Sequence, residues 1–296
     1  MTAVDVPSGV LASMTTPAPG SPELARLSLN QKTTQRWSVP EAVEGCVQRG
    51  IPAIGLWREH VAATGVEASA RAVREAGLRV SSLCRGGFLT ADDDTARREA
   101  LDDNRRAIEE AATLGAECLV LVVGGLPKGS RDLDGARERV RASLEVLAPA
   151  AADHGVRLAL EPLHPMYCAD RAVLSTLGQA LDFAEPYPPD VVGVAVDTFH
   201  IWWDPDVRAQ ILRAGPRIAT FQVCDWLTPL PCDVLMGRGM MGDGHIDFAP
   251  LRDAVAAAGY TGDIEVEIFN DDVWDADPHA VLDTTARRYV ERVLRA

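Results

Sequence analysis

The sequence has few of the features that mark membrane, extracellular or nucleic-acid-binding proteins. Its six cysteines are scattered without a C-x-x-C pair, which favours reduced, buried thiols in a cytoplasmic protein. No run approaches the roughly 20 apolar residues of a membrane span. Basic residues are also scarce, because 29 Lys and Arg face 43 Asp and Glu, for a formal net charge of −14. This acidic balance opposes attraction to phosphate backbones, so nucleic acid is not an expected partner.

The N-terminal stretch lacks the basic start and apolar core of a secretory signal. Residues 1–22 are rich in Pro, Ser, Thr and Gly, and this composition predicts a disordered tail. The length of 296 residues allows one large domain or two. We therefore look to the order of elements after the tail to decide between them.

Short runs rich in Val, Ile and Leu alternate with longer segments rich in Ala, Arg and Glu up to the C-terminus. Ser38 to Glu41 form a predicted capping box that opens a helix ending before Gly50. Eight βα units without a break in composition predict an α/β fold, a (β/α)8 TIM barrel, as a single catalytic domain over residues 23–296. The predicted strands are 26–30, 53–57, 79–84, 118–123, 157–161, 191–197, 217–223 and 263–268.

A doubly wound sheet is the alternative, but it would normally carry a glycine-rich phosphate turn after its first strand. The first predicted strand leads instead into Gln31-Lys32-Thr33-Thr34, with no G-x-G-x-x-G. The barrel is therefore the preferred interpretation.

Polar side chains mark the ends of four consecutive predicted strands, where a barrel places its working residues. Alternation along each strand turns these side chains into the barrel mouth. They are Glu161, Asp197, Gln222 and Glu267, with Glu265 inward and deeper. Each acid alone could cap a helix or meet an arginine. Three carboxylates that converge in a partly desolvated cavity need a compensating cation, and a divalent metal ion supplies it. The all-oxygen set suits Mn²⁺ or Mg²⁺ better than Zn²⁺, with Co²⁺ also open and Mn²⁺ preferred.

Four segments carry a resemblance that covers essentially the whole chain after the tail. The segments LALEPLHP (158–165), VGVAVDTFHIWWDP (192–205), GRGMMGDGHIDF (237–248) and EVEIF (265–269) resemble those of the sugar phosphate isomerase/epimerase superfamily. These xylose-isomerase-like barrels include inosose isomerases, ketose 3-epimerases and inosose dehydratases. The resemblance implies one divalent metal held by Glu161, Asp197, Gln222 and Glu267, with Gln222 standing where many members have a histidine.

The resemblance also implies roles for the residues around the metal. Glu161 and Glu267 would be both ligands and proton-transfer groups, acting as base and acid on a carbon next to a carbonyl through a metal-stabilised enediolate. His200 and Arg238 would bind the substrate. From the residues alone, His200 could equally be a core histidine, and Arg238 could form a salt bridge with Asp225 or Asp243.

Further candidates follow other strand ends. His164, in the loop after the fifth strand, is a candidate catalytic acid or base, or else a solvated loop residue. Trp57 and Arg85 are candidate substrate-binding residues, an apolar wall and an anion contact. Trp202 and Trp203 could extend that wall or pack a helix.

Two functions stand ahead of the others. The first is isomerisation or epimerisation of a sugar, keto-sugar or cyclic polyol. The alternative is a lyase that uses the same enediolate for β-elimination, as in an inosose dehydratase or in cleavage of 3-oxo-glycosides. A DNA-repair enzyme on the same barrel fits poorly, since the multi-zinc sites of such enzymes need more histidines than this rim offers. The remaining hypothesis is a non-enzymatic barrel with a vestigial site. By resemblance only, we also expect a homo-oligomer.

Overall fold

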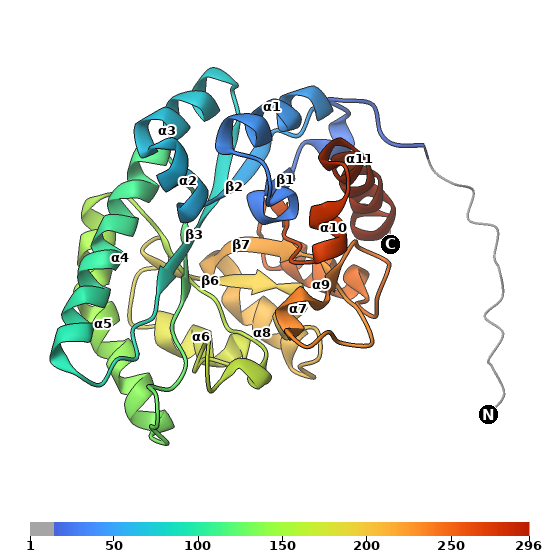
Figure 1. Cartoon of the computed structure of the whole chain (residues 1–296). Helices are drawn as coiled ribbons and strands as arrows, with labels where there is room; N and C mark the ends of the chain where they lie inside the picture. The colour runs from blue at the N-terminus through green and yellow to red at the C-terminus, as the bar shows by residue number, and fades with distance from the viewer. Residues whose placement is uncertain (1–14, 296) are drawn as a thin grey trace, which may run out of the picture.

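The computed structural model describes residues 15–295 and contains a closed barrel of parallel strands (Figure 1). Neighbours around the barrel follow the order β1-β10-β7-β6-β5-β4-β3-β2, so the last strand closes onto the first. The barrel strands are β1 (Leu27–Asn30), β2 (Ala53–Trp57), β3 (Arg79–Gly87), β4 (Leu119–Val122), β5 (Leu158–Leu160), β6 (Val192–Asp197), β7 (Ile218–Val223) and β10 (Ile264–Val266). The predicted TIM barrel is confirmed, and each strand lies within three residues of its predicted bounds.

Helices surround the strands as an outer layer (Figure 1). They are α1 (Val39–Arg49), α2 (Arg58–Thr64), α3 (Val66–Glu75), α4 (Asp94–Leu114), α5 (Leu133–Asp153), α6 (Leu177–Ala184), α7 (Thr198–Ile201), α8 (Val207–Ala214), α9 (Phe248–Ala257), α10 (Asp271–Asp275) and α11 (Pro278–Arg288). The predicted capping box is present, since Ser38 and Glu41 bond each other's backbone N–H groups. Gly50 ends α1 with φ of 70°, a left-handed conformation that glycine adopts without a Cβ clash.

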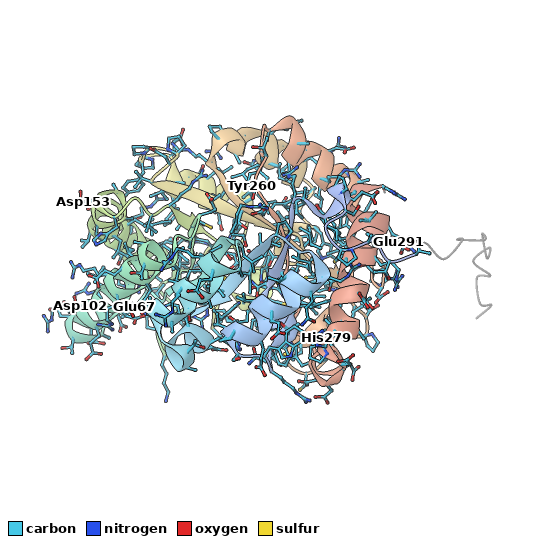
Figure 2. All side chains as sticks on the ribbon, turned by 90° about the horizontal axis from the view of Figure 1, so that it is seen from above. Glu67, Asp102, Asp153, Tyr260, His279 and Glu291 are labelled. Carbon is cyan, nitrogen blue, oxygen red and sulfur yellow. The ribbon has the colours of Figure 1, made fainter. Side chains whose placement is uncertain are left out.

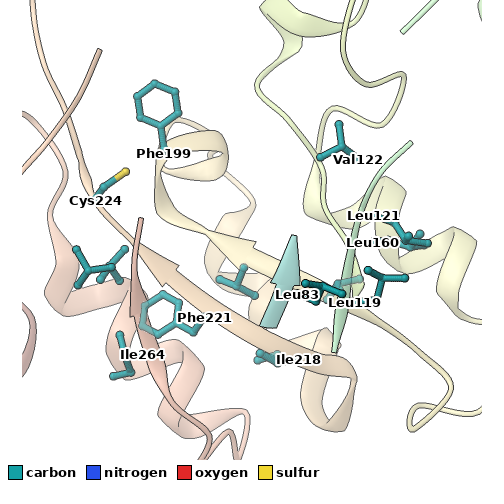
Figure 3. Packing of buried hydrophobic residues seen from close by; sticks show 14 of the residues in the cluster. Leu83, Leu119, Leu121, Val122, Leu160, Phe199, Ile218, Phe221, Cys224 and Ile264 are labelled. Carbon is teal, nitrogen blue, oxygen red and sulfur yellow. The ribbon is translucent and has the colours of Figure 1, made fainter. Parts of the chain in front are cut away.

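Two apolar clusters divide the interior. The larger one lies between strands and helices, where Phe221 of β7 is the aligned partner of Ile264 in β10 (Figure 3). The smaller one consists of the short side chains that alternation turns into the barrel, namely Cys84, Cys118, Val120, Ala159, Ala195 and Ala219. Small side chains on the barrel axis leave room above them for a hollow at the carboxyl ends of the strands.

Acidic side chains are exposed along the helices. Glu67, Asp102 and Asp153 are exposed on α3, α4 and α5 (Figure 2). The six cysteines are free thiols, with Cys232 exposed and Cys168 half-buried, so the prediction of unpaired cysteines is confirmed. Across residues 15–295, no helix combines the length and the apolar character needed to cross a bilayer. Residues 1–14 of the predicted tail lie outside the described residues, whereas Pro17 accepts a hydrogen bond of 2.7 Å from Arg49 Nη2.

One pair of strands was missed by the sequence reasoning. β8 (Asp225–Trp226) and β9 (Arg238–Gly239) form a two-stranded antiparallel sheet beside the barrel. Two residues are too few to show an alternating pattern, so no periodicity marks them. This small sheet carries Arg238.

Candidate active site

The four predicted strand-end residues gather at the carboxyl end of the barrel. Asp197 and Gln222 are aligned partners across β6 and β7, and Gln222 is in turn aligned with Glu265 of β10. Glu161 directly follows β5, and Glu267 directly follows β10. All of these side chains are buried, with residue exposures of 5% or less. Strand register therefore explains why residues far apart in the chain meet here.

His200 joins two of the acids. Asp197 caps α7 by accepting the backbone N–H of Phe199 at 2.8 Å, which places His200 one turn further on the same side. One potential ligand atom each from Glu161, Asp197 and His200 lies within 4.8 Å of the others. Burial lowers the pKa of His200 well below its ordinary value, with Arg238 adding to the effect, so the imidazole is neutral.

Arg238 lies buried among the acids. Its Nη1 donates to Asp197 Oδ2 and to Glu267 Oε2, both at 3.0 Å, and its Nη2 donates to His200 Nε2 at 3.1 Å. Neither alternative partner considered for it is used. Asp225 instead accepts backbone N–H groups of the 242–246 turn, and Asp243 pairs with Arg288. Arg238 thus links the carboxylate of β6 to the one beyond β10.

The acids outnumber the cation at this position. Burial raises the pKa of Glu161 well above its ordinary value, and the charges of Asp197 and Glu267 raise it further. Burial also raises the pKa of Glu267, to about 8, against the opposing effect of Arg238. Three buried carboxyl groups face one guanidinium, so without another cation the cluster must retain protons.

The donor set fits a divalent ion. Gln222 Nε2 donates to Glu265 Oε1 at 3.0 Å, and because a carboxylate only accepts, the amide oxygen must face the other way. Gln222 Oε1 is buried and has no hydrogen-bond partner. An unpartnered acceptor beside excess carboxylates is unfavourable by itself but favourable around a hard cation, which prefers oxygen ligands. The residues present therefore fit a divalent metal site.

Glu265 lies below the cluster and has a different environment. It is fully buried, and it accepts hydrogen bonds from neutral donors of β1, β3 and β7, which are Asn30, Ser81, Ser82 and Gln222. Gly55 of β2 leaves the space it fills, since a Cβ there would lie 2.6 Å from the Glu265 carboxyl carbon. Alternation predicted that Glu265 points inward. Its hydrogen-bond donors come from strands distant in sequence, so no local sequence pattern predicted them.

A cavity of about 240 Å³ opens above the acids. This volume is below the 300–1,000 Å³ typical of drug-sized ligands, so the cavity suits a small ligand. Among the predicted site residues, its lining includes Trp57, Arg85, Glu161, His200, Arg238 and Glu267. Sequence reasoning did not single out Glu59, Phe88, Leu163, Arg171, Leu235 and Phe269, which also line it. Lys32 lines it as well, and its ammonium group lies 4.7 Å from the Trp57 ring centroid.

His164, Trp202 and Trp203 lie outside the lining of this cavity. The His164 ring packs 5.2 Å from the ring centroids of Trp203 and Trp226, and its Nδ1 accepts the Met166 backbone N–H. Burial lowers its pKa. Trp202 packs against Trp226 at 5.8 Å. His164, Trp202 and Trp203 do not line the cavity, so the structure does not bring them together with the acids.

Known proteins share this architecture. The model of the family described as "Xylose isomerase-like TIM barrel" matches residues 43–291. A protein of Sinorhizobium meliloti 1021, SMc04130, has a solved structure that is 49% identical and superposes with a TM-score of 0.89, covering 91% of this chain and 99% of that one.

Two curated relatives are enzymes longer than the matched region. An L-ribulose 3-epimerase of Mesorhizobium japonicum is 31% identical over 138 residues, which are 46% of this chain and 42% of the epimerase. A 3-dehydroshikimate dehydratase of Pseudomonas aeruginosa is 29% identical over 244 residues, which are 79% of this chain and 36% of the dehydratase. The chain thus spans less than half the length of each. Since the family model covers most of the sequence, the chain belongs to the xylose isomerase-like TIM barrel family of the sugar isomerase/epimerase superfamily.

Proposed function

We propose that this protein is a divalent-metal-dependent isomerase or epimerase of a sugar, keto-sugar or cyclic polyol. One observation carries the proposal: two buried glutamates, Glu161 from the end of β5 and Glu267 from the end of β10, line the same small cavity. Between them lie Asp197 and Arg238, which link them by hydrogen bonds and charge. Inversion at carbon uses two such groups, one on each side of the reacting atom.

Glu161, Asp197, Gln222 and Glu267 would hold the metal, and Mn²⁺ is the ion we expect first, with Mg²⁺ and Co²⁺ as alternatives. The arrangement of Glu161, Asp197 and His200 within 4.8 Å supports a site of this kind. When bound, the ion would polarise the substrate's carbonyl and adjacent hydroxyl oxygens and so acidify the proton on the carbon between them.

The proton itself would move between the protein's carboxyl groups and the substrate. One glutamate, deprotonated, takes the proton from carbon, and the other, protonated, returns one. In the metal-free protein burial raises the pKa of Glu267 to about 8, and a bound cation would lower it toward the deprotonated form that a base requires. His200 and Arg238 would hold substrate oxygens, and Trp57 would pack against the carbon skeleton.

A lyase is the second candidate, and the dehydratase relative is the observation that favours it. The same removal of a proton next to a carbonyl can be followed by loss of a β-leaving group instead of reprotonation. A leaving group needs an additional acid, and His164 would be that acid if the loop that carries it turned toward the cavity.

The test is solvent-deuterium exchange. The metal-free protein is incubated in D₂O with a panel of ketoses, 3-keto-sugars and inososes, with and without Mn²⁺, and exchange is followed by NMR. We expect metal-dependent incorporation of one deuteron next to a carbonyl, lost in Glu161→Gln and Glu267→Gln.

Absence of metal-dependent exchange with every ketose and inosose would overturn the isomerase proposal. Release of water or of an aglycone from a 3-keto compound, without epimer formation, would establish the lyase instead. Equal metal content in Glu161→Ala and in the unchanged protein would refute the assigned metal site.

A further inference from the structure

The positively charged residues around the cavity differ in how they are paired. Lys32 pairs with Glu59, Arg171 lies 3.4 Å from Asp233, and Arg238 contacts Asp197 and Glu267. Arg85 is the exception among these four. Its side chain makes no hydrogen bond and no ion pair with any residue in the described part of the chain.

The position of Arg85 suits it to bind something from solution. It lies in β3, is half-buried and lines the cavity. Its guanidinium carbon lies 4.3 Å from the centroid of the Phe88 ring. Stacking uses the face of the guanidinium and leaves its five N–H groups, which lie in its plane, free to donate.

The stacking ring is itself held in an unusual way. Phe88 has a φ of 56°, a left-handed conformation that few non-glycine residues adopt, and its side chain is 47% exposed. Backbone hydrogen bonds from Phe88 to Val122 (2.9 Å) and from Leu89 to Val123 (2.7 Å) hold this turn against β4. The left-handed backbone at Phe88 holds the aromatic ring in solvent, where the ring adds nothing to core packing. The ring instead packs against the guanidinium of Arg85.

A second guanidinium lines the same cavity. Arg171 comes from the loop after β5, and its guanidinium lies 3.4 Å from Asp233 and 3.8 Å from Asp170. Burial lowers the pKa of Arg85 against the opposing effects of Cys84, Glu161 and Glu59, and the charge of Arg171 adds a smaller lowering effect. Two guanidinium groups that repel each other in a small cavity are stabilised together by one anion.

We propose that Arg85 and Arg171 form an anion subsite and that the substrate is a keto-sugar or cyclic keto-polyol bearing a carboxylate or phosphate. Arg85 donates to the anion directly, and Arg171 adds the second positive charge. This inference rests on the proposed function for the keto-sugar or keto-polyol part of the substrate and for its orientation, with its carbonyl end toward Glu161 and Glu267. The shared chemistry is a planar or tetrahedral oxyanion, which guanidinium groups bind through paired N–H donors.

Binding of unreactive ligands tests the subsite without any catalytic step. The full-length protein loaded with Mn²⁺ is titrated calorimetrically with ribitol, ribitol 5-phosphate and ribonate, which share a polyol chain and differ in the end group. We expect at least one anion to bind roughly 10- to 100-fold more tightly than ribitol, the range of a charge-assisted contact. The two anions distinguish a phosphate subsite from a carboxylate subsite.

Three variants locate the effect. Arg85→Met should remove the preference for the anion and leave the affinity for ribitol unchanged, whereas Arg85→Lys should keep part of the preference. Arg141→Met is the matched control, because Arg141 also stacks on a phenylalanine, Phe183 at 3.7 Å, but does so on α5 away from the cavity. It should behave as the unchanged protein.

Equal affinity for the three ligands, no measurable binding of either anion, or an anion preference that survives Arg85→Met would each overturn the subsite. These results are separable from the fate of the isomerase proposal. If no compound exchanges deuterium but the preference depends on Arg85, the subsite stands without the reaction. If neutral ketoses exchange and Arg85→Met changes nothing, the reaction stands without the subsite.

Discussion

The two ends of the barrel both contain a hollow lined by charged side chains, yet only one has the character of an active site. The hollow at the amino ends of the strands is the larger, at about 650 Å³ against about 240 Å³. Its lining includes three arginines and three acids, which are Arg26, Arg79, Arg157, Glu117, Asp190 and Asp263.

At the amino end, no acid of the hollow is both buried and unpaired, since Glu117 and Asp190 are exposed. Arg79 pairs with Asp263, and Arg157 donates to the carbonyl oxygens of Pro216 and Ile218. At the carboxyl end, by contrast, three buried carboxyl groups share Arg238, and Gln222 has an acceptor without a donor. Unbalanced buried charge, and not volume, therefore distinguishes the carboxyl end as the candidate active site, because folding alone gives no reason to bury it.

The largest difference between the two ends is expected when one acid at each end is neutralised. Glu161→Gln and Glu267→Gln should each reduce the rate of deuterium exchange by roughly 10³-fold, the range of a lost acid or base. Glu117→Gln, in the amino-end hollow, should leave the rate within about twofold. A similar loss from Glu117→Gln would show that the two ends do not differ as argued.

Removal of metal should expose the excess of negative charge as a pH-dependent stability. Since the raised pKa of Glu267, about 8, lies above its value in the unfolded chain, the folded metal-free protein binds protons that the unfolded chain has released. Stability is therefore full at low pH and is lost as the pH rises through about 8. His164 and His200 have lowered pKa values, so their effects fall below about pH 6.5, and the change from about pH 7 to 8.5 comes from the raised pKa values of Glu267 and Glu161 and of the buried cysteine thiols.

We expect the melting temperature of the metal-free protein to fall across that range and Glu267→Gln to flatten the decline. Saturating Mn²⁺, at about 100 times its dissociation constant, should raise the melting temperature by roughly 5–10 °C, and more at the higher pH. Differential scanning calorimetry provides the measurement. A metal-free protein whose stability rises between pH 7 and 8.5 would contradict the charge balance proposed for the carboxyl end.

The amide of Gln222 tests whether the unpartnered oxygen at the carboxyl end binds the metal. Gln222→Met removes the unpartnered oxygen and should weaken Mn²⁺ binding by roughly 10- to 100-fold, as judged by titration. Ser82→Ala is the control, since it removes a different donor to Glu265 and takes no oxygen from the acid cluster. If both variants weaken the metal equally, Gln222 acts through Glu265 and is no ligand.

The smallest effect belongs to the amino end. Arg79→Met breaks an ion pair whose arginine is 47% exposed, and such pairs contribute about 0–1 kcal/mol. Denaturant unfolding should show a change within that range, and exchange kinetics should be unaffected. A loss of activity would place the amino-end hollow in the function after all.

The strands and the acids at their ends were predictable because both follow from local patterns. Alternation and helix-ending glycines predicted the strand bounds within three residues. The last inward position of four strands then predicted the site residues Glu161, Asp197, Gln222 and Glu267. Arg238 was named as a site residue, but its place between Asp197 and Glu267 depends on a sheet of two-residue strands that carries no periodic signal. The donors to Glu265 were not predictable either, because barrel closure alone brings Asn30 near it.

The bonding of Glu265 also determines when the site can exist during synthesis. Its donors come from β1, β3 and β7, but the carboxylate arrives with β10, the last strand of the barrel. Until then Gln222 has no acceptor to fix its amide, and Arg238 lacks one of its two carboxylate partners. A ribosome-bound chain that stops before β10 therefore holds three of the four strands of the site but not its geometry. Adding the missing C-terminal segment as a separate fragment should order the side chains of Gln222 and Arg238 together.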